Sequence, residues 1–360
     1  MNFQRLSCLL ALVSLSVVGL EDCKANIITS NITNGSVELS INPLNSFTTA
    51  ALTSLNATAW ESWSFTSVSN ASNAGATVIF YRDPTLIPPS LYEYLTIYKC
   101  DNITTGLWTG DLGNATFEVK GQDVKVQLDM RSILNGEVTG SFNIQSSTPL
   151  VSSAIDMSPY LTWGPGILAP NTTSNVTIAD RAIQFHDGLG AADHLIAPYN
   201  WISIAEKWWW TRSVIGPYTL VYWELVSAID HQTHTITYLS QDGAMLFHSR
   251  TKCADSNTVQ TDCVAFQLSY LAGTYGSYDD KSTGYEIQLH GKEKRWSFEV
   301  RHELVEYESK DSQFVLSPIA LDYEYSRFVD EVYGGEMGCE VRRGVGRSEQ
   351  NRVRNGSPVL

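Results

Sequence analysis

The candidate functional side chains in this sequence are tryptophans. Five of the ten fall within 23 residues: Trp201, Trp208, Trp209, Trp210 and Trp223. Indole is the largest apolar side chain and carries one N–H donor, so such a cluster can line a pocket for a large, flat or hydrophobic ligand. The alternative is a β-core with a thick aromatic layer. In a strand, side chains alternate, so Trp208 and Trp210 would share one face and Trp209 would take the other.

No motif for covalent, metal or cofactor chemistry accompanies this cluster. The sequence holds no G-x-S-x-G elbow, no H-E-x-x-H, no P-loop and no dinucleotide-binding G-x-G-x-x-G. The histidine–carboxylate neighbours, such as His186 with Asp187 and Asp230 with His234, match no standard metal-ligand spacing. We therefore expect neither a metal nor a cofactor.

Glu61 is the acidic residue in the most unusual setting. It lies between Trp60 and Trp63, where bulky aromatic groups would desolvate its carboxyl group and favour the protonated form. On the polar face of a strand it would instead be an ordinary surface residue. Both interpretations remain open at this point.

An aromatic pocket without a nucleophile can bind a hydrophobic ligand, or it can catalyse a reaction by holding the substrate in its reactive conformation. A [4+2] cycloaddition needs no nucleophile, only a polyene held with its diene over its dienophile. Holding the reacting carbons at near-attack distance contributes several kcal/mol, up to about 7–11 kcal/mol. A hydrogen bond to a carbonyl conjugated with the dienophile adds electrostatic stabilisation, and an indole N–H, a tyrosine hydroxyl or a protonated glutamate can donate it.

Strands dominate the elements that would position these residues. Residues 116–120 and 124–128 alternate between polar and apolar around a short turn, and residues 285–289 and 296–300 form a second hairpin pattern. Helical periodicity is scarce. Strands at intervals of about ten residues predict an all-β chain of sandwich or barrel architecture.

Composition divides the chain into two predicted domains. Residues 159–177 are rich in Pro, Gly, Asn and Thr, which is typical of a connection. We therefore predict an N-terminal domain over residues 26–178 and a C-terminal domain over residues 179–346. The polar residues 347–360 predict a disordered tail.

The N-terminus and the sequons indicate the secretory pathway. Residues 1–19 have the charged start, short apolar run and small residues of a signal peptide, and this run is too short to span a membrane. The sequons, most of them before residue 180, predict glycosylation at Asn31, Asn34, Asn56, Asn70, Asn102, Asn114, Asn171 and Asn175. The net charge of −14 argues against nucleic acid and anionic membranes as partners.

One disulfide is predicted from the cysteines. Cys253 and Cys263 flank a polar loop between two strand-like runs, which favours a local bond between them. Cys23, Cys100 and Cys339 cannot be paired from the sequence.

Several stretches are together similar to the fungal Diels–Alderase family of natural-product pathways, itself related to the hydroxyneurosporene synthase-like and lipocalin-like group. Residues 58–65 (TAWESWSF) resemble a W-E-x-W-Y-F-D opening, although Ser64 and Thr66 replace the family's aromatic residue and aspartate. The other matching stretches are residues 185–194 with Trp201, residues 210–218, residues 276–285 with 295–303, and residues 334–346. Their order and spacing make the set more specific than any one motif.

The resemblance implies an all-β fold of two domains, an N-terminal β-sandwich-like domain and a C-terminal lipocalin-like barrel, with the pocket at their junction. It also implies a cofactor-free [4+2] cyclisation of a hydrophobic polyene, a linear polyketide or polyketide–amino acid hybrid, to a decalin or isoindolone ring. The motif matches assign catalytic roles to Glu61, Trp223 and Trp296. The substrate-binding candidates are Trp63, Phe65, Trp201, Trp208, Trp210 and Tyr222.

Three alternatives stay open on the sequence. One is an intermolecular hetero-Diels–Alder reaction that joins a tropolone quinone methide to a sesquiterpene. Another is a lipocalin-like carrier that binds a hydrophobic metabolite without changing it. A hydratase or isomerase would need an acid, for which Asp193 or Glu61 are the candidates. The oligomeric state is not indicated.

Overall fold

The structure is a computed structural model that describes most of the chain. The described residues are 26–28, 33–37, 39–40, 51–52, 54–71, 74–83, 94–100, 103–110, 112–121, 123–132, 136–146, 155–167, 171–254, 261–276, 281–309 and 322–354. Among them, no helix is long and apolar enough to cross a membrane.

The elements are almost all strands, as predicted. The one helix among the described residues is the single turn α2, Trp201–Ile204. The strands are β1 Asn26–Ile28, β2 Leu39–Ser40, β3 Ala51–Leu52, β4 Trp60–Ser69, β5 Gly75–Arg82, β6 Tyr94–Cys100, β7 Ile103–Gly110, β8 Gly113–Lys120, β9 Asp123–Ser132, β10 Gly136–Gln145, β11 Ile155–Ser158, β12 Leu161–Ile167, β13 Asn171–Ile178, β14 Arg181–Phe185, β15 Gly188–Ala197, β16 Ala205–Ile215, β17 Tyr218–Ser227, β18 Thr233–Gln241, β19 Ala244–Ser249, β20 Cys263–Ser269, β21 Gly284–His290, β22 Arg295–Ser309, β23 Asp322–Glu336 and β24 Arg342–Arg354.

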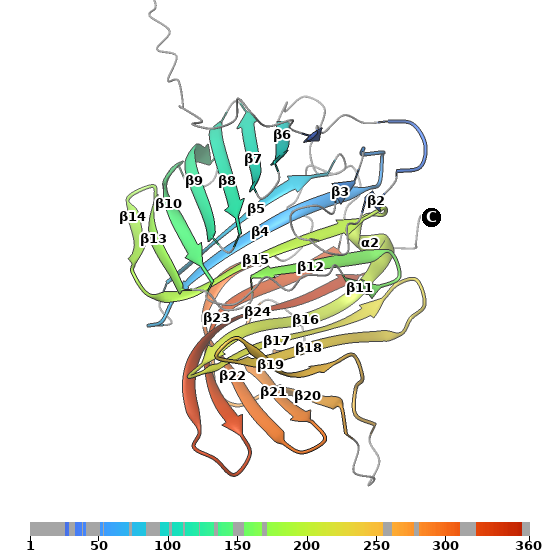
Figure 1. The fold of residues 1–360 in the computed structure, drawn as a ribbon, viewed down its shortest axis with the longest axis vertical. Coiled ribbons are helices and arrows are strands. Elements are labelled where there is room, and N and C mark those ends of the chain that lie inside the picture. Colours follow the sequence, from blue (N-terminus) through green and yellow to red (C-terminus); the bar gives the residue numbers. More distant parts are fainter. Residues whose placement is uncertain are drawn as a thin grey trace, which may run out of the picture.

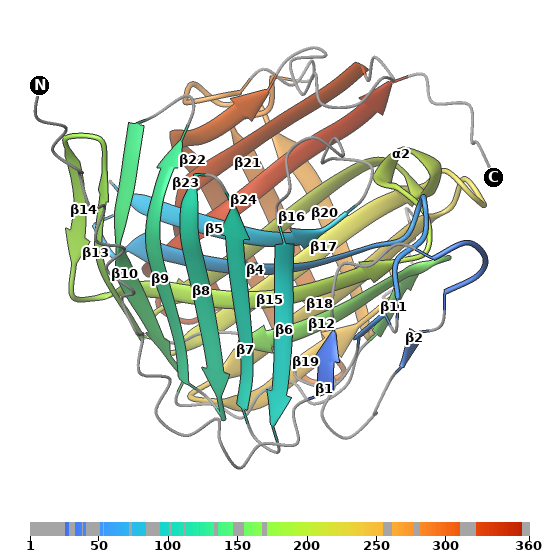
Figure 2. The same cartoon turned by 90° about the horizontal axis from the view of Figure 1, so that it is seen from above.

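The first sheet has thirteen strands and folds over itself, as a sandwich does. Strands β6 to β10 follow one another in sequence order, and β13, β15, β12 and β11 continue the sheet, while β4 pairs with β15 and β5. Figures 1 and 2 show β4, β5 and β15 crossing the β6–β10 strands. Phe65, Phe117 and Phe142 are buried in the core between these two layers.

The second sheet has nine strands and curls into a barrel. Its order is β19-β18-β17-β16-β24-β23-β22-β21-β20, and it forms the lower half of the molecule in Figure 1. A parallel bridge between Lys252 and Val264 joins the two edges of the sheet. Trp209, Tyr285 and Phe298 are among the residues that fill its interior. The predicted pairing of a sandwich-like domain with a lipocalin-like barrel is confirmed.

Alternation explains why these segments form strands. In the β8–β9 hairpin, Phe117 and Val126 are buried while their neighbours Glu118 and Lys125 are exposed. Gly121 opens the turn at φ +59°, a conformation that costs glycine little. The hairpins predicted at residues 116–128 and 285–300 are both present.

The predicted domain boundary near residue 178 is wrong. The first sheet continues through β14 and β15 to Ala197, and the second begins with β16 at Ala205. Residues 159–177 looked like a connection, but most of them belong to β12 and β13. In β13 the exposed and buried side chains alternate, so Asn171, Thr173 and Asn175 face solvent while Thr172, Ser174 and Val176 are buried.

The predicted disorder from residue 347 is also wrong, because β24 continues to Arg354. This segment is polar because both of its faces meet polar groups inside the molecule. Arg347 forms ion pairs with Glu306 and Glu349, and Ser348 hydrogen bonds to Asp330. Residues 355–360 lie outside the described residues.

The predicted disulfide between Cys253 and Cys263 is confirmed. It lies at the seam where the barrel closes, next to the bridge between Lys252 and Val264. A ring nitrogen of His290 lies within 4.8 Å of both sulfur atoms, but bonded cysteines offer no thiolate to a metal. Cys339 is free and exposed, whereas the pairing of Cys23 and Cys100 lies outside the described part of the chain.

Removing this disulfide should destabilise the barrel. A bond across a separation of 10 residues restricts the unfolded chain, which is worth about 2–3 kcal/mol for a loop of this length. Urea unfolding of Cys253→Ala/Cys263→Ala should show that loss. Cys339→Ser is the matched control and should unfold like wild type. Equal stability of all three proteins would contradict the assigned role of the seam.

Candidate active site

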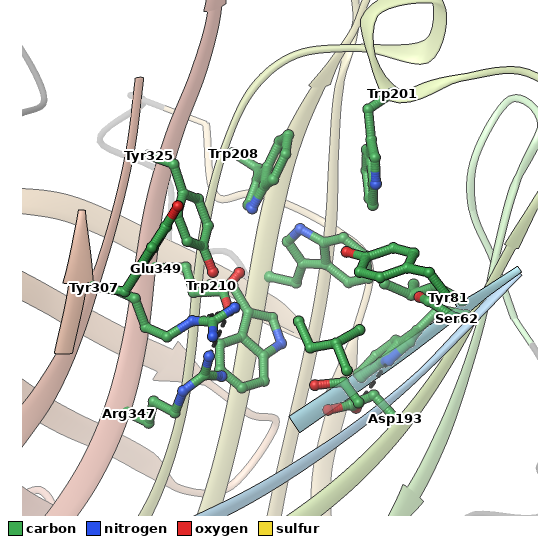
Figure 3. A pocket seen from close by; sticks show the side chains of 16 residues that line it. Ser62, Tyr81, Asp193, Trp201, Trp208, Trp210, Tyr307, Tyr325, Arg347 and Glu349 are labelled. Carbon is green, nitrogen blue, oxygen red and sulfur yellow. Dashed lines mark hydrogen bonds and ion pairs between the residues drawn. The ribbon is translucent and has the colours of Figure 1, made fainter. Parts of the chain in front are cut away.

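A cavity of about 320 Å3 lies between the two sheets. Strands β4, β5, β12 and β15 of the first sheet form one side, and β16, β17 and β22–β24 of the second form the other. Figure 3 shows the side chains that line it. They are Ser62, Ser64, Ile79, Tyr81, Trp163, Asp193, Leu195, Trp201, Trp208, Trp210, Trp223, Tyr307, Tyr325, Arg327, Arg347 and Glu349.

Five tryptophans supply the flat surfaces of the cavity. Trp201 on α2 stacks on Trp208 with ring centroids 4.8 Å apart. Trp163 meets Trp223 edge to face at 5.4 Å, and Trp210 pairs with Trp223 across the β16–β17 ladder. Rigid aromatic walls suit a conjugated hydrocarbon chain, because they give a large contact area with few rotatable bonds to order.

The alternation predicted for the tryptophan cluster is confirmed. Trp208 and Trp210 line the cavity, whereas Trp209 points into the barrel interior. The guanidinium carbons of Arg212 and Arg347 each lie 5.4 Å from the Trp210 ring centroid. These cation–π contacts fix the Trp210 indole in the wall.

Asp193 is the anionic group that the first sheet contributes. Its Oδ1 accepts hydrogen bonds from Trp163 Nε1 at 3.1 Å and from Arg212 Nη2 at 2.6 Å. Arg212 is fully buried, and its Nε and Nη1 have no hydrogen-bond partner. Asp193 is therefore the group that compensates the buried charge of Arg212. Oδ2 of Asp193 takes no hydrogen bond from the described residues, so it can accept one from a ligand.

Glu349 is the carboxylate that the second sheet contributes. Its Oε1 lies 3.2 Å from Arg327 Nε and 2.9 Å from Arg347 Nη2, and Tyr325 and Trp208 also donate hydrogen bonds to it. Burial acts to raise the pKa of Glu349, but the two arginine charges and the hydrogen bonds outweigh it, so the pKa lies below its usual value. Glu349 is therefore ionised at neutral pH.

Tyr81 and Trp223 each offer a neutral hydrogen-bond donor in the cavity. Burial raises the pKa of the Tyr81 hydroxyl to about 12, against the opposing charge of Arg327, so Tyr81 keeps its proton at physiological pH. The indole Nε1 of Trp223 is buried and has no hydrogen-bond partner. A buried donor without an acceptor is costly, and a substrate carbonyl in the cavity would relieve that cost.

The lowered pKa of Glu349 predicts that the folded protein loses stability at acidic pH. Because its folded pKa is lowered, the stability that it contributes is present above its usual pKa of 4.5 and is lost as the pH falls through the folded pKa. In wild type, the thermal midpoint should fall as the pH is lowered below the usual carboxyl pKa of 4.5. In Glu349→Gln the midpoint should fall less over the same pH range. The exposed-carboxylate control Glu118→Gln should keep the wild-type slope. A Glu349→Gln profile parallel to wild type would contradict this account.

Comparison with known proteins identifies the family. The family model described as Diels-Alderase-like matches residues 21–87 and 89–353. This chain belongs to the Diels-Alderase-like family. The resemblance seen in the sequence motifs is thereby confirmed.

Curated relatives of this Diels-Alderase-like chain come from fungi. Hexane cyclase xenF of Xenoacremonium sinensis is 25% identical over 334 residues, which cover 82% of this chain and 74% of xenF. Diels-Alderase mycB of Thermothelomyces thermophilus is 25% identical over 362 residues, 88% of this chain and 79% of mycB. The crystal structure of CghA with Sch210972 has a TM-score of 0.76 at 21% identity and covers 92% of this chain and 99% of CghA. That likeness establishes the fold.

Four of the predicted site residues line the cavity of this Diels-Alderase-like protein: Trp201, Trp208, Trp210 and Trp223. Five do not. Trp63 and Phe65 lie in the core of the first sheet. Tyr222 and Trp296 lie in the barrel interior, where Tyr222 donates a hydrogen bond to Glu224. The fifth is Glu61.

Glu61 is buried on the face of β4 that points away from the cavity, since its neighbours Ser62 and Ser64 line it. Its carboxylate forms an ion pair with Arg82 and lies 2.7 Å from His194 Nε2. Of the two interpretations left open for Glu61, the buried one is correct, since its side chain is fully buried, but the buried cation of Arg82 compensates its charge. The predicted donation from Glu61 to a substrate is therefore not supported by this placement.

Several cavity residues escaped the sequence analysis: Tyr81, Trp163, Tyr307, Tyr325, Arg327, Arg347 and Glu349. The available signal was weak. Arg347 and Glu349 are two apart, as expected for one face of a strand, but they lie in a segment whose polarity suggested a frayed tail.

Proposed function

We propose that this chain is a pericyclase that accelerates an intramolecular [4+2] cycloaddition of a linear polyketide or polyketide–amino acid polyene. The observation that carries the proposal is the interdomain cavity, which five tryptophans line and in which Trp223 Nε1 has no partner. The relatives xenF and mycB are named as a hexane cyclase and a Diels-Alderase. A volume of about 320 Å3, at the lower end for ligand sites, favours one folded chain over two separate reactants.

The aromatic walls would act by restricting the substrate. A free polyene samples many conformers, few of which place the diene over the dienophile. The stacked Trp201 and Trp208 and the edge-to-face Trp163 and Trp223 would provide flat walls against which one folded conformer packs. Selecting that conformer removes part of the entropic barrier, up to about 7–11 kcal/mol in the best cases, and also decides which face reacts.

The polar groups would act on the electronics and on the orientation. Tyr81 O–H and Trp223 N–H can donate to a carbonyl conjugated with the dienophile, which draws electron density from it as charge develops in the transition state. Oδ2 of Asp193 can accept a hydrogen bond from the polar end of the substrate. The fixed pair of Glu349 with Arg347 keeps Trp208 in place through its hydrogen bond.

The test is to incubate the purified protein with a synthetic linear polyene and to follow products by chromatography and mass spectrometry. The proposal predicts faster cyclisation than in buffer and one dominant diastereomer. EDTA should leave the rate unchanged. Recovery of bound but unreacted polyene, with the uncatalysed diastereomer ratio, would support a carrier and overturn the proposal.

We also propose that the protein enters the secretory pathway and is N-glycosylated. Asn34, Asn70, Asn114, Asn171 and Asn175 are exposed, which is what the attachment of a glycan needs, while Asn31 and Asn102 lie outside the described residues. Asn56 differs, because its amide donates to the Gly35 carbonyl at 3.0 Å and accepts from the Ala59 N–H at 2.8 Å. Peptide mapping of protein secreted by a fungal host should find glycan at the exposed sites and an unmodified Asn56. Complete occupancy of Asn56 would contradict this prediction, and intracellular retention without glycan would contradict the pathway.

A further inference from the structure

A cluster of buried polar side chains lies inside the barrel, on the faces of β23 and β24 that point away from the cavity. His302 Nδ1 lies 2.8 Å from Asp330 Oδ1, which also accepts a hydrogen bond from Ser348 Oγ at 2.9 Å. Gln350 Nε2 lies 3.2 Å from His302 Nε2 and also donates to Ser282 Oγ. All five side chains are at most 3% exposed. We call these residues the His302 cluster.

The His302 cluster lies where β22 departs from regular pairing. The register with β23 shifts between His302 and Leu304, and again between Val305 and Tyr307. Each shift is a bulge that inserts one extra residue into β22. The extra residue of the second bulge is Glu306. Bulges are enriched beside active sites, where they re-aim side chains.

The two bulges set the position of Tyr307 in the cavity. In an unbroken register, counted on from His302 opposite Asp330, Tyr307 would pair with Tyr325. With the bulges it pairs with Arg327. The difference is two residues along β23, roughly 7 Å at 3.4 Å per residue.

The bulges also reverse the direction of Glu306. In an unbroken alternation Glu306 would point into the barrel, on the same face as His302. Instead, its carboxylate accepts hydrogen bonds from Thr77 Oγ1 of the first sheet at 2.9 Å and from Arg347 Nε at 3.0 Å. Glu306 thus joins the two sheets at the cavity and orients Arg347.

The cluster holds β24 from the side opposite the cavity as well. Ser348 and Gln350 belong to the cluster, while Arg347 and Glu349, which alternate with them, line the cavity. Burial raises the pKa of Asp330, against the opposing effects of His302 and Ser348. Burying a polar group without a hydrogen bond is costly, so the hydrogen bonds of the cluster favour this arrangement of β22, β23 and β24 over others.

We propose that the His302 cluster is a positioning device for the cavity: it holds the bulges of β22, and through them the places of Tyr307 and Glu306. Its members touch no substrate. The inference rests on the proposed pericyclase function and adds residues to it that lie outside the cavity lining.

The variant His302→Leu tests this role. We expect kcat/KM for cyclisation to fall about tenfold, since small misplacements of positioning groups have effects of this size or larger, and the diastereomer ratio to move toward the uncatalysed one. His302→Asn, whose amide nitrogen can replace Nδ1, should recover most of the kcat/KM and most of the wild-type diastereomer ratio. Thr237→Val is the matched control, because it removes a buried hydroxyl without a hydrogen-bond partner from β18, on the same strand face as Leu239 of the barrel interior, and Thr237 is not part of the His302 cluster. It should leave both unchanged.

A second variant keeps the proposal falsifiable if His302→Leu does not fold. Ser348→Ala removes one hydrogen bond of the cluster and should give a smaller change in the same direction. In a Tyr307→Phe/Glu306→Gln background, the effect of His302→Leu on kcat/KM should largely disappear, because the groups through which it acts are gone. Full additivity there, or wild-type kinetics and product ratio in both His302→Leu and Ser348→Ala, would overturn the proposal.

Amide hydrogen exchange separates this inference from the proposed function. In His302→Leu, the amides of residues 303–307 should exchange faster than in wild type, while those of β17 should not change. If wild type shows no cyclisation but this difference is present, the proposed function fails and the structural role of the cluster stands. If wild type cyclises and exchange at residues 303–307 is unchanged in the variant, the positioning role fails alone.

Discussion

Replacing Trp223 by phenylalanine is expected to lower kcat/KM for the cyclisation by about tenfold or more, since one preorganised donor is worth at least that much in many active sites. The variant removes the unpartnered Nε1 donor and part of the wall shared with Trp163 and Trp210. It should also relax the diastereomer ratio, because the folded chain gains room.

Trp296→Phe is the matched control for this prediction. Trp223 and Trp296 are both 3% exposed, and both have an Nε1 without a partner, but Trp296 faces the barrel interior rather than the cavity. Both variants should lose about 1–2 kcal/mol of unfolding free energy, measured in urea. Only Trp223→Phe should lose turnover. Equal turnover in the two variants would contradict the assignment of the cavity.

The second large effect is expected at Asp193. In Asp193→Asn the buried Arg212 keeps its charge but loses its only ion-pair partner among the described residues. Breaking a buried pair in this way costs about 3–5 kcal/mol of stability. Turnover should fall as well, because the cavity loses its free acceptor Oδ2. Urea unfolding and the cyclisation assay measure the two losses separately.

Two further variants isolate the cause. Asp193→Leu/Arg212→Met removes both charges and should recover most of the stability, because a matched apolar pair is often no less stable than a buried ion pair. It should not recover turnover. Glu137→Gln breaks the exposed pair with Arg131, whose side chains are 73% exposed, and should change little. An Asp193→Asn protein as stable as wild type would refute the dependence of Arg212 on Asp193.

The sequence predicts best what depends on the geometry of single strands. The separation of Trp208 and Trp210 from Trp209 follows from alternation alone, and the structure confirms it. The disulfide between Cys253 and Cys263 was predictable for a similar reason, since its loop is short and lies between two strand-like runs.

Glu61 shows where prediction from the sequence stops. Its aromatic neighbours left open whether the carboxylate is desolvated or at the surface, because the face of β4 that meets the second sheet depends on the packing of distant strands. Its partners Arg82 and His194 are 21 and 133 residues away. A motif that contains only the near neighbours cannot show that the charge is already compensated.

The strand β24 shows the opposite error, in which burial was missed. Polar sequence usually indicates exposure, but Arg347 and Ser348 are 2% and 0% exposed because ion pairs and hydrogen bonds satisfy them on both faces of the strand. The same pairs bring charged groups to the cavity. Functional sites often break the rule that polar residues lie outside.

The most direct test of the cavity as the site of cyclisation is a crystal structure of the protein after soaking with the linear polyene. The account predicts density for the cyclised product in the interdomain cavity, against Trp208 and Trp223, with a carbonyl oxygen near Trp223 Nε1 or the Tyr81 hydroxyl. Density for the unreacted chain in the same place would contradict catalysis. Product bound in the barrel interior, with the interdomain cavity empty, would contradict the site.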